Sequence, residues 1–177
     1  MRKSDKLLGA LAEAVSAGGG IHSVAELAFA LGEPCDPAFK KFLSDCVKRG
    51  LLRRVAKGLY ESAITPPKPE TAIYKLITKL RSNVLSYISL ESQLSYTGEI
   101  SQVVMDRVTV MTKGRSGCFD TPYGIIEFTH TKKPVKQIAG NLYYDPTIKM
   151  YRAHREQAVA DLKHCQRNLH LLETYGA

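Results

Sequence analysis

The sequence predicts an α+β protein with a small, mainly helical N-terminal domain and a larger C-terminal domain of helices and strands. Residues 4–49 place apolar side chains at helical spacing, whereas residues 107–130 alternate apolar and polar residues as strands do. The stretch TPPKP between them has three prolines in five residues and favours an extended, semi-rigid linker. We therefore expect domains at 1–65 and 70–177, joined by a linker at 66–69.

Composition and charge favour a globular protein with an anionic partner. The 177 residues are 44% hydrophobic and 24% charged, and the formal net charge is +8. From Lys40 to Lys57, seven cations stand against one anion, Asp45, a local net charge of +6. Clustered Lys and Arg side chains gain affinity for nucleic acid by displacing counterions from phosphates. The stretch from Lys40 to Lys57 is therefore the first candidate binding surface.

The N-terminal domain begins with two predicted helices. Residues 4–17 form the first, which three glycines end, and residues 21–22 form a short strand. Ser23 with Glu26 three residues later makes a capping box for a second helix at 24–31. We expect the first helix to be scaffold.

A third helix is predicted from Asp36 to Arg49. Asp36 is a favourable N-cap, Pro37 occupies the first helical position, and Gly50 can adopt the left-handed conformation that ends a helix. One face of this helix is apolar and formed by Phe39, Phe42, Leu43, Cys46 and Val47. The other face carries Lys40, Lys41, Ser44 and Lys48. We expect the apolar face to be buried and the polar face to be free.

A basic β-hairpin follows this helix at once. Residues 51–55 and 59–60 are predicted strands, and Lys57-Gly58 supplies the turn. Helices followed by a basic hairpin are the winged helix-turn-helix pattern, which binds double-stranded DNA. The predicted DNA-binding residues are Lys40, Lys41, Ser44, Lys48, Arg53, Arg54 and Lys57. We expect Lys40, Lys41 and Ser44 to face the major groove, and Arg53, Arg54 and Lys57 to contact phosphates or the adjacent minor groove.

The C-terminal domain is predicted to contain a mainly antiparallel sheet. A helix at 70–80 and a strand at 84–88 precede a short helix that Ser89 caps and Gly98 ends. Strands are expected at 107–112, 118–121 and 124–130 as an antiparallel unit, and at 141–144 and 148–152. The domain closes with one helix whose apolar stripe is Ala158, Leu162, Cys165, Leu169 and Leu172.

No catalytic, metal or cofactor site is expected. The loop from Lys113 to Gly117 could bind a phosphate through its glycines and Arg115, but a plain hairpin turn is the favoured interpretation. Asp120 and Glu127 could hold Mg²⁺ for a nuclease, yet Thr129 stands where a restriction-nuclease-type site has lysine. The four cysteines include no CxxC pair, and the histidines lack the spacing of zinc sites. We expect a protein that is not an enzyme.

No apolar run reaches the length of a membrane span, and the N-terminus has no cleavage site of the signal-peptide type. We expect a cytoplasmic protein that does not bind membranes.

Several segments together resemble the AbiEi family, the antitoxins of type IV (AbiE, abortive infection) toxin-antitoxin systems, which act in phage defence. These segments are GLLRRVAKGLY in the hairpin, YISLESQLSYTGEI after the linker and VTVMTKGRSGCFDTPYGIIEFTH in the β unit. An A-x-x-E-Q-A-x-x-D-L spacing near the end adds Ala153, Glu156, Gln157, Ala158, Asp161 and Leu162. The resemblance spans nearly the whole chain.

The resemblance implies a transcriptional repressor that regulates its own operon. Its winged helix would bind inverted repeats in its own promoter, as a monomer in solution that pairs on DNA. Its C-terminal domain would counteract a co-encoded nucleotidyltransferase-like toxin. The residues alone leave two alternatives open: a winged-helix scaffold for protein interactions without sequence-specific DNA binding, and a nuclease-like enzyme.

Overall fold

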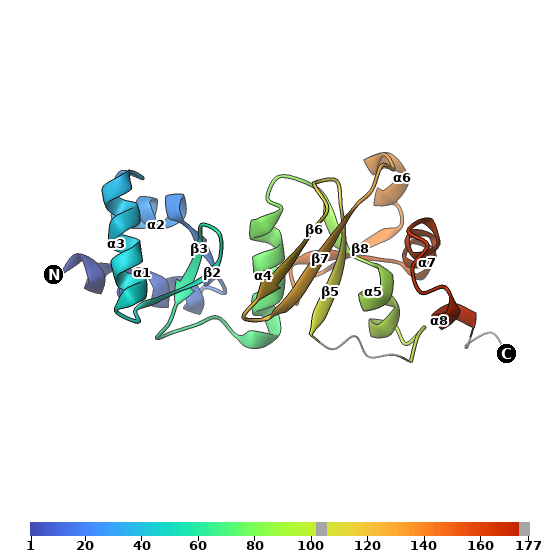
Figure 1. Ribbon diagram of the computed structural model, residues 1–177, viewed down its shortest axis with the longest axis horizontal. Helices are drawn as coiled ribbons and strands as arrows, with labels where there is room; N and C mark the ends of the chain where they lie inside the picture. The colour runs from blue at the N-terminus through green and yellow to red at the C-terminus, as the bar shows by residue number, and fades with distance from the viewer. Residues whose placement is uncertain (102–105, 174–177) are drawn as a thin grey trace. The chain divides into compact units, whose positions relative to one another are not determined.

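The computed structural model describes residues 1–101 and 106–173 and shows an α+β fold (Figure 1). The chain divides into two compact units, residues 1–79 and the residues from Leu80 onward. The final four residues of the predicted 70–177 domain lie outside the described part. Along the described residues, no helix is long and apolar enough to cross a membrane.

The N-terminal unit is a winged helix-turn-helix, as predicted. Its elements are α1 (Lys3–Ser16), β1 (His22–Ser23), α2 (Val24–Leu31), α3 (Pro37–Lys48), β2 (Leu52–Ala56) and β3 (Leu59–Ser62), followed by α4 (Pro69–Leu80). The strands form an antiparallel sheet in the order β1-β3-β2. The β2–β3 hairpin is the wing.

Local capping explains why the helices begin and end where they do. Ser23 Oγ accepts a hydrogen bond from the backbone N–H of Glu26 while Glu26 accepts one from that of Ser23, which confirms the capping box of α2. Asp36 Oδ1 accepts the backbone N–H of Phe39 at 2.7 Å, so Asp36 is the N-cap of α3. Gly50, at φ +71°, lies just past the end of α3 in the left-handed conformation.

The core of this unit lies between its first three helices and the wing. Its fully buried members are Leu7, Leu11, Leu27, Ala28, Phe39, Leu43, Cys46 and Leu52. The apolar stripe predicted for α3 supplies three of these side chains, and Phe42 and Val47 pack partly buried against them. Burial of that stripe leaves the opposite face of α3 outward.

The domain boundary lies later than predicted, at the end of α4 and not in the proline-rich segment. That segment contacts the N-terminal unit: a Cβ on Gly20 would lie 2.8 Å from Cβ of Pro67, so the chain passes too close there for a side chain. At the other end of α4, the ammonium of Lys79 pairs with the carboxylate of Glu26 in α2. These contacts bind residues 67–79 to the first unit.

The second unit is built on a six-stranded sheet. Its strands are β4 (Ser86–Ile88), β5 (Arg107–Thr112), β6 (Gly117–Thr121), β7 (Gly124–His130), β8 (Leu142–Asp145) and β9 (Met150–Ala153). Its helices are α5 (Leu90–Tyr96), α6 (Val135–Ala139), α7 (Arg155–His164) and α8 (His170–Glu173). Helices α5 and α7 pack against each other, and the core between helices and sheet includes Tyr87, Leu94, Met111 and Leu162.

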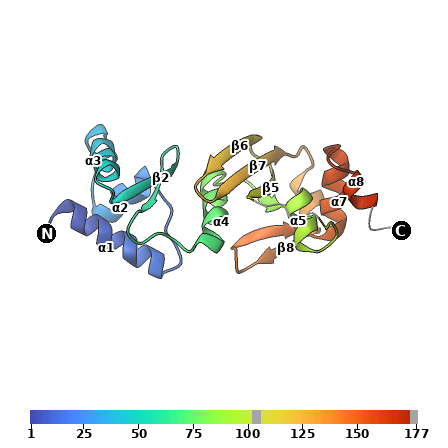
Figure 2. The ribbon, with the colours of Figure 1, turned by 60° about the horizontal axis from the view of Figure 1, so that its bottom comes forward.

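The sheet is mixed but mainly antiparallel, as predicted, although the expected antiparallel unit at 107–130 contains a parallel pair. The strand order is β6-β7-β5-β4-β9-β8, with the β5–β7 and β4–β9 pairs parallel and the other three pairs antiparallel. Figure 2 shows β6, β7 and β5 side by side. Strand β6 does not pair with β5, because β7 lies between them. The loop from Lys113 to Ser116 instead crosses the end of β7, where Ser116 Oγ accepts the backbone N–H of His130 at 2.8 Å. Lys113–Gly117 is therefore not a hairpin turn.

The predicted closing helix is interrupted. Helix α7 ends at His164, and Gln166 and Asn168 have φ values of +52° and +42°, which no α-helix accommodates. Between them, Arg167 extends its side chain to Glu91 and Glu127. The stripe is therefore continuous only through Ala158 and Leu162, which are fully buried.

Candidate nucleic-acid interface

The outer face of α3 carries the four polar residues that the sequence indicated. Lys40, Lys41, Ser44 and Lys48 are all exposed, while Phe39, Leu43 and Cys46 on the opposite face are buried. Residues 40, 44 and 48 follow one another at four-residue steps, so they align along one side of the helix. Apolar packing therefore determines which face α3 presents.

Contacts from α1 fix the first turns of α3. The rings of Phe39 and Phe42 lie 5.9 Å apart between centroids, and Lys3 Nζ lies 5.2 Å and 4.8 Å from those centroids. Lys3 also pairs with Glu33 at 3.0 Å, in the turn between α2 and α3. Cation–π contacts of this kind hold the N-terminal end of α3 against α1.

The wing turns at Lys57-Gly58, as predicted, with Gly58 at φ +72°. A side chain at this position would strain the turn, so glycine suits it. The register between β2 and β3 shifts between Arg54 and Ala56. Both Arg53 and Arg54, which precede this shift, are exposed.

Arg53 has a structural partner that the sequence analysis missed. Its guanidinium pairs with the carboxylate of Glu61, directly opposite it on β3, and Nε donates at 2.6 Å. The side chain of Glu61 is fully buried, whereas that of Arg53 is 47% exposed. Arg53 therefore compensates a buried charge inside the wing, and its cation is less available to a phosphate than the prediction assumed.

The other predicted DNA-binding cations form few ion pairs within the protein. Within the described residues, Lys40, Lys41 and Lys57 make no ion pair, and Lys48 approaches Asp45 only to 3.9 Å on an exposed helix face. Arg54 Nε donates to the carbonyl oxygen of Ala56 at 3.3 Å. Helix α3 is in contact with β2, so these cations lie on adjoining elements. Exposed cations without an ion-pair partner can bind the phosphates of a duplex.

In the second unit, the motif residues behind the family resemblance form a buried polar network. Asp161 is 1% exposed and accepts hydrogen bonds from Tyr87 Oη at 3.0 Å, Ser89 Oγ at 2.7 Å and Gln157 Nε2 at 2.7 Å. Burial, together with the charge of Asp161, raises the pKa of Tyr87, so its hydroxyl remains a donor. Ser89 precedes α5, but its hydroxyl donates to Asp161 and caps nothing, which corrects the predicted role.

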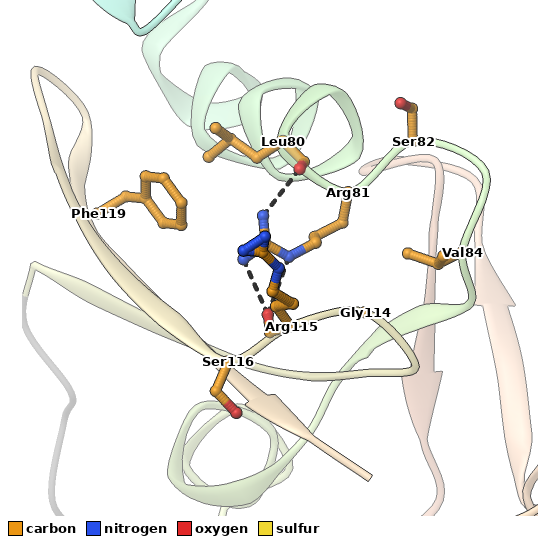
Figure 3. A pocket seen from close by; sticks show the side chains of 8 residues that line it. All are labelled: Leu80, Arg81, Ser82, Val84, Gly114, Arg115, Ser116 and Phe119. Carbon is orange, nitrogen blue, oxygen red and sulfur yellow. Dashed lines mark hydrogen bonds between the residues drawn. The ribbon is translucent and has the colours of Figure 1, made fainter.

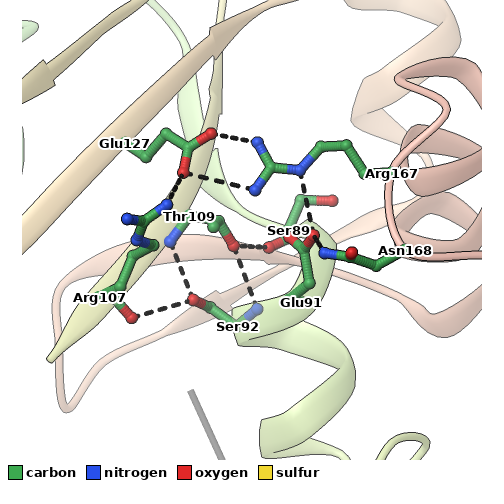
Figure 4. A network of polar contacts seen from close by, with 8 residues as sticks. All are labelled: Ser89, Glu91, Ser92, Arg107, Thr109, Glu127, Arg167 and Asn168. Carbon is green, nitrogen blue, oxygen red and sulfur yellow. Dashed lines mark hydrogen bonds and ion pairs between the residues drawn. The ribbon is translucent and has the colours of Figure 1, made fainter. Parts of the chain in front are cut away.

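A second network ties the segment after α7 to the sheet (Figure 4). Arg167 donates to Glu91 Oε1 at 3.0 Å and pairs with Glu127, which Arg107 also reaches at 2.8 Å. Asn168 Nδ2 donates to the same oxygen of Glu91 at 2.8 Å. Hydrogen bonding from Arg167 and the charges of both arginines hold the pKa of Glu127 below its usual range.

These arginine contacts also bear on the carboxylate pair considered for Mg²⁺. Glu127 is engaged by two arginines, while Asp120 is an exposed residue of β6 that pairs with Ile125 of β7. No group of three or more His, Cys, Asp or Glu side chains suited to a metal occurs among the described residues.

No protein-family model matches the sequence, and no curated protein matches it. Among solved structures, the chain is similar to the crystal structure of the Rv2827c protein from Mycobacterium tuberculosis, with a TM-score of 0.62 and 11% sequence identity. The match covers 90% of this chain and 59% of the Rv2827c chain. At this identity the likeness is one of fold: a winged helix followed by an α+β unit.

Proposed function

We propose that the N-terminal unit binds double-stranded DNA, with α3 in the major groove and the wing on the neighbouring backbone. The observation that carries this proposal is the outer face of α3, where Lys40, Lys41, Ser44 and Lys48 are exposed opposite a fully packed apolar face. A helix that is fixed by packing and presents polar side chains outward suits the recognition role in this motif.

The residues then divide into two groups. Lys40 and Lys41 lie in the first half of α3, the part of a recognition helix that reaches base edges, and Ser44 follows Lys40 one turn later on the same face. Arg54 and Lys57 lie on the wing and contact phosphates, which supplies affinity without sequence information. Arg53 belongs to the same surface but acts first as the partner of Glu61.

A gel shift with the DNA upstream of the chain's own gene tests the proposal. We expect a discrete complex at low salt that weakens at higher salt, and weaker binding to a scrambled duplex of equal length. Equal binding to both duplexes would favour the alternative, a winged-helix scaffold without sequence-specific recognition.

Substitutions on α3 separate base reading from charge. Ser44→Ala removes a hydroxyl without changing the charge, so we expect a relaxed sequence preference at one position of the footprint, with little change in salt dependence. Lys163 is an exposed residue of α7, so Lys163→Ala removes a charge elsewhere and serves as the control. An unaltered preference in Ser44→Ala and Lys41→Ala would argue against α3 as the reader.

We further propose that the protein is an antitoxin of the AbiEi type. It represses its own operon by binding inverted repeats and counteracts a co-encoded nucleotidyltransferase-like toxin through its second unit. The sequence resemblance supports this, and so does the convergence of its motif residues on Asp161, which gives those residues a common structural role. The fold shared with Rv2827c is compatible with it.

Co-expression with the product of the neighbouring reading frame tests the antitoxin role. We expect the chain to restore growth that this product inhibits. An Arg54→Ala/Lys57→Ala variant should lose promoter repression yet still restore growth, because the wing belongs to the other unit. A neighbour without toxicity, or growth inhibition that the chain leaves unchanged, would contradict the proposal.

The protein is proposed to act by binding and not by catalysis. Arg107 and Arg167 both engage the carboxylate of Glu127, so it is not free to share a cation with Asp120, which disfavours the nuclease alternative. Incubation of the complex with Mg²⁺ should leave the DNA intact, and cleavage that Glu127→Gln abolishes would refute this.

A further inference from the structure

The second unit contains a pocket that the DNA-binding role does not use. It has a volume of about 520 Å³ and lies beside the loop that crosses the end of β7 (Figure 3). Its walls include Arg81, Val84, Gly114, Arg115, Ser116 and Phe119. Cavities of this size are typical of sites for small ligands.

Arg81 is held rigidly in this pocket without being neutralised. Nε and Nη2 donate to the carbonyl oxygen of Arg115 at 3.0 Å and 2.8 Å, and Nη1 donates to that of Leu80 at 2.9 Å. The guanidinium carbon lies 4.4 Å from the ring centroid of Phe128 and 5.3 Å from that of Phe119. Carbonyl and ring contacts orient the group but leave its full positive charge in place.

A second arginine adds to this charge. Arg115 is exposed at the pocket and makes no ion pair within the described part of the chain, and none of the described residues lining the pocket has a carboxylate. Burial, and then the nearby charge of Arg115, lowers the pKa of Arg81. Two cations without an anion are unfavourable together, so an anionic ligand would stabilise the site.

The glycines of the KGRSG loop shape the pocket. A Cβ on Gly114 would lie 3.0 Å from Cδ of Arg81 and 3.2 Å from Cγ2 of Val84, and one on Gly117 would lie 3.4 Å from the ring of Phe119. Gly114 thus lets the loop backbone approach Arg81 closely enough to accept its hydrogen bonds. The loop binds Arg81 through the carbonyl oxygen of Arg115, and the guanidinium groups of Arg81 and Arg115 supply the positive charge.

The other walls suit a flat, apolar group. Phe119 packs edge-on against Phe128, with ring centroids 5.8 Å apart, and its ring lines the pocket together with Val84, which is 40% exposed. Aromatic side chains beside arginines are the usual combination for stacking a base next to its phosphate. Ser116, also at the wall, supplies a hydroxyl.

We propose that this pocket binds a nucleotide, either free or at the end of a nucleic-acid strand. The phosphate oxygens lie on the guanidinium groups of Arg81 and Arg115, and the base lies against the ring of Phe119. The site belongs to the second unit, so its occupancy does not depend on DNA binding by the winged helix.

Isothermal titration of the full chain tests the proposal. The probes are ATP, CTP, GTP, UTP, inorganic tripolyphosphate and a 5′-phosphorylated single-stranded oligonucleotide. We expect saturable binding of at least one base-containing probe at one site per chain. Binding of free nucleotides identifies a mononucleotide site, and binding of the oligonucleotide alone identifies a strand end. Saturable binding of none of them at millimolar concentration would overturn the proposal.

Variants locate the binding in the pocket. Arg115→Gln changes an exposed side chain and should weaken binding by about tenfold, the effect of losing one charge-assisted contact. Phe119→Leu should weaken the binding of base-containing probes and leave the affinity for tripolyphosphate within about twofold of wild type. Lys163→Gln on α7 is the charge-matched control, and its binding of every probe should stay within about twofold of wild type. Equal losses in Arg115→Gln and Lys163→Gln would indicate unspecific charge attraction and reject the site.

Discussion

Replacement of Asp161 tests whether the buried network stabilises the second unit. The carboxylate accepts three hydrogen bonds, from Tyr87, Ser89 and Gln157, and both hydroxyl-bearing residues are 0% exposed. Asp161→Ala removes the shared acceptor and leaves these donors buried without a partner. Hydrogen bonds to charged groups contribute about 1.5–3 kcal/mol each.

The net cost is smaller than the sum of the three bonds, because burying the carboxylate is itself unfavourable. Losing one member of a buried charged network typically costs about 3–5 kcal/mol. In a unit of this size, that lowers Tm by more than about 10 °C. Asp161→Asn keeps one acceptor oxygen and lets the hydroxyl groups reorient, so we expect a loss of about 1–2 kcal/mol.

Differential scanning calorimetry of the full chain measures this effect. Since the chain has two compact units, the transition of the winged helix serves as an internal reference that should not move. Asp120→Asn, an exposed carboxylate on β6, is the matched control and should change stability by less than about 0.5 kcal/mol. Equal effects of Asp161→Ala and Asp120→Asn would refute the stabilising role of the network.

Two further predictions concern ion pairs. Arg167 and Arg107 lower the pKa of Glu127, so these ion pairs stabilise the fold above the unfolded carboxyl's pKa of about 4.3, and that contribution is lost as pH falls through the lower folded value. In urea, Glu127→Gln should therefore have a lower free energy of unfolding than wild type at pH 7, and the two should converge in acid. A constant difference at all pH values would contradict this. Arg53→Met should destabilise the winged helix by about 2 kcal/mol, less than for a fully buried pair because Arg53 is half exposed. Chemical denaturation of Arg53→Met/Glu61→Met should show that most of this loss is recovered. No recovery would show that Glu61 is stabilised mainly by other groups.

Local signals in the sequence were sufficient for the winged helix. The capping box at Ser23 and Glu26, the N-cap at Asp36 and the turn at Lys57-Gly58 each act within a few residues, so they specify the bounds of α2, α3 and the wing. The alternation of apolar and polar residues likewise predicted the observed bounds of β5 and β7. These features require no knowledge of distant parts of the chain.

The missed features depend on partners far apart in sequence. Alternation in residues 107–130 shows strands but not their neighbours, so the insertion of β7 between β5 and β6 was not predictable from it. The end of α7 has no glycine or proline; the chain turns where Arg167 meets Glu91 and Glu127, residues 76 and 40 positions away. The Arg53–Glu61 pair was missed for a more local reason. A regular two-residue turn at Lys57-Gly58 would place Arg54 opposite Glu61, and only the register shift between Arg54 and Ala56 places Arg53 there.

The salt dependence of DNA binding tests the central claim most directly. Fluorescence anisotropy with the upstream duplex gives Kd at several salt concentrations for the wild type and for Arg54→Ala/Lys57→Ala. If both wing residues contact phosphates, the slope of log Kd against log salt should fall by about 1.8, at about 0.9 per contact. Lys163→Ala should leave the slope unchanged. An unchanged slope and affinity in the double variant would contradict the proposed interface.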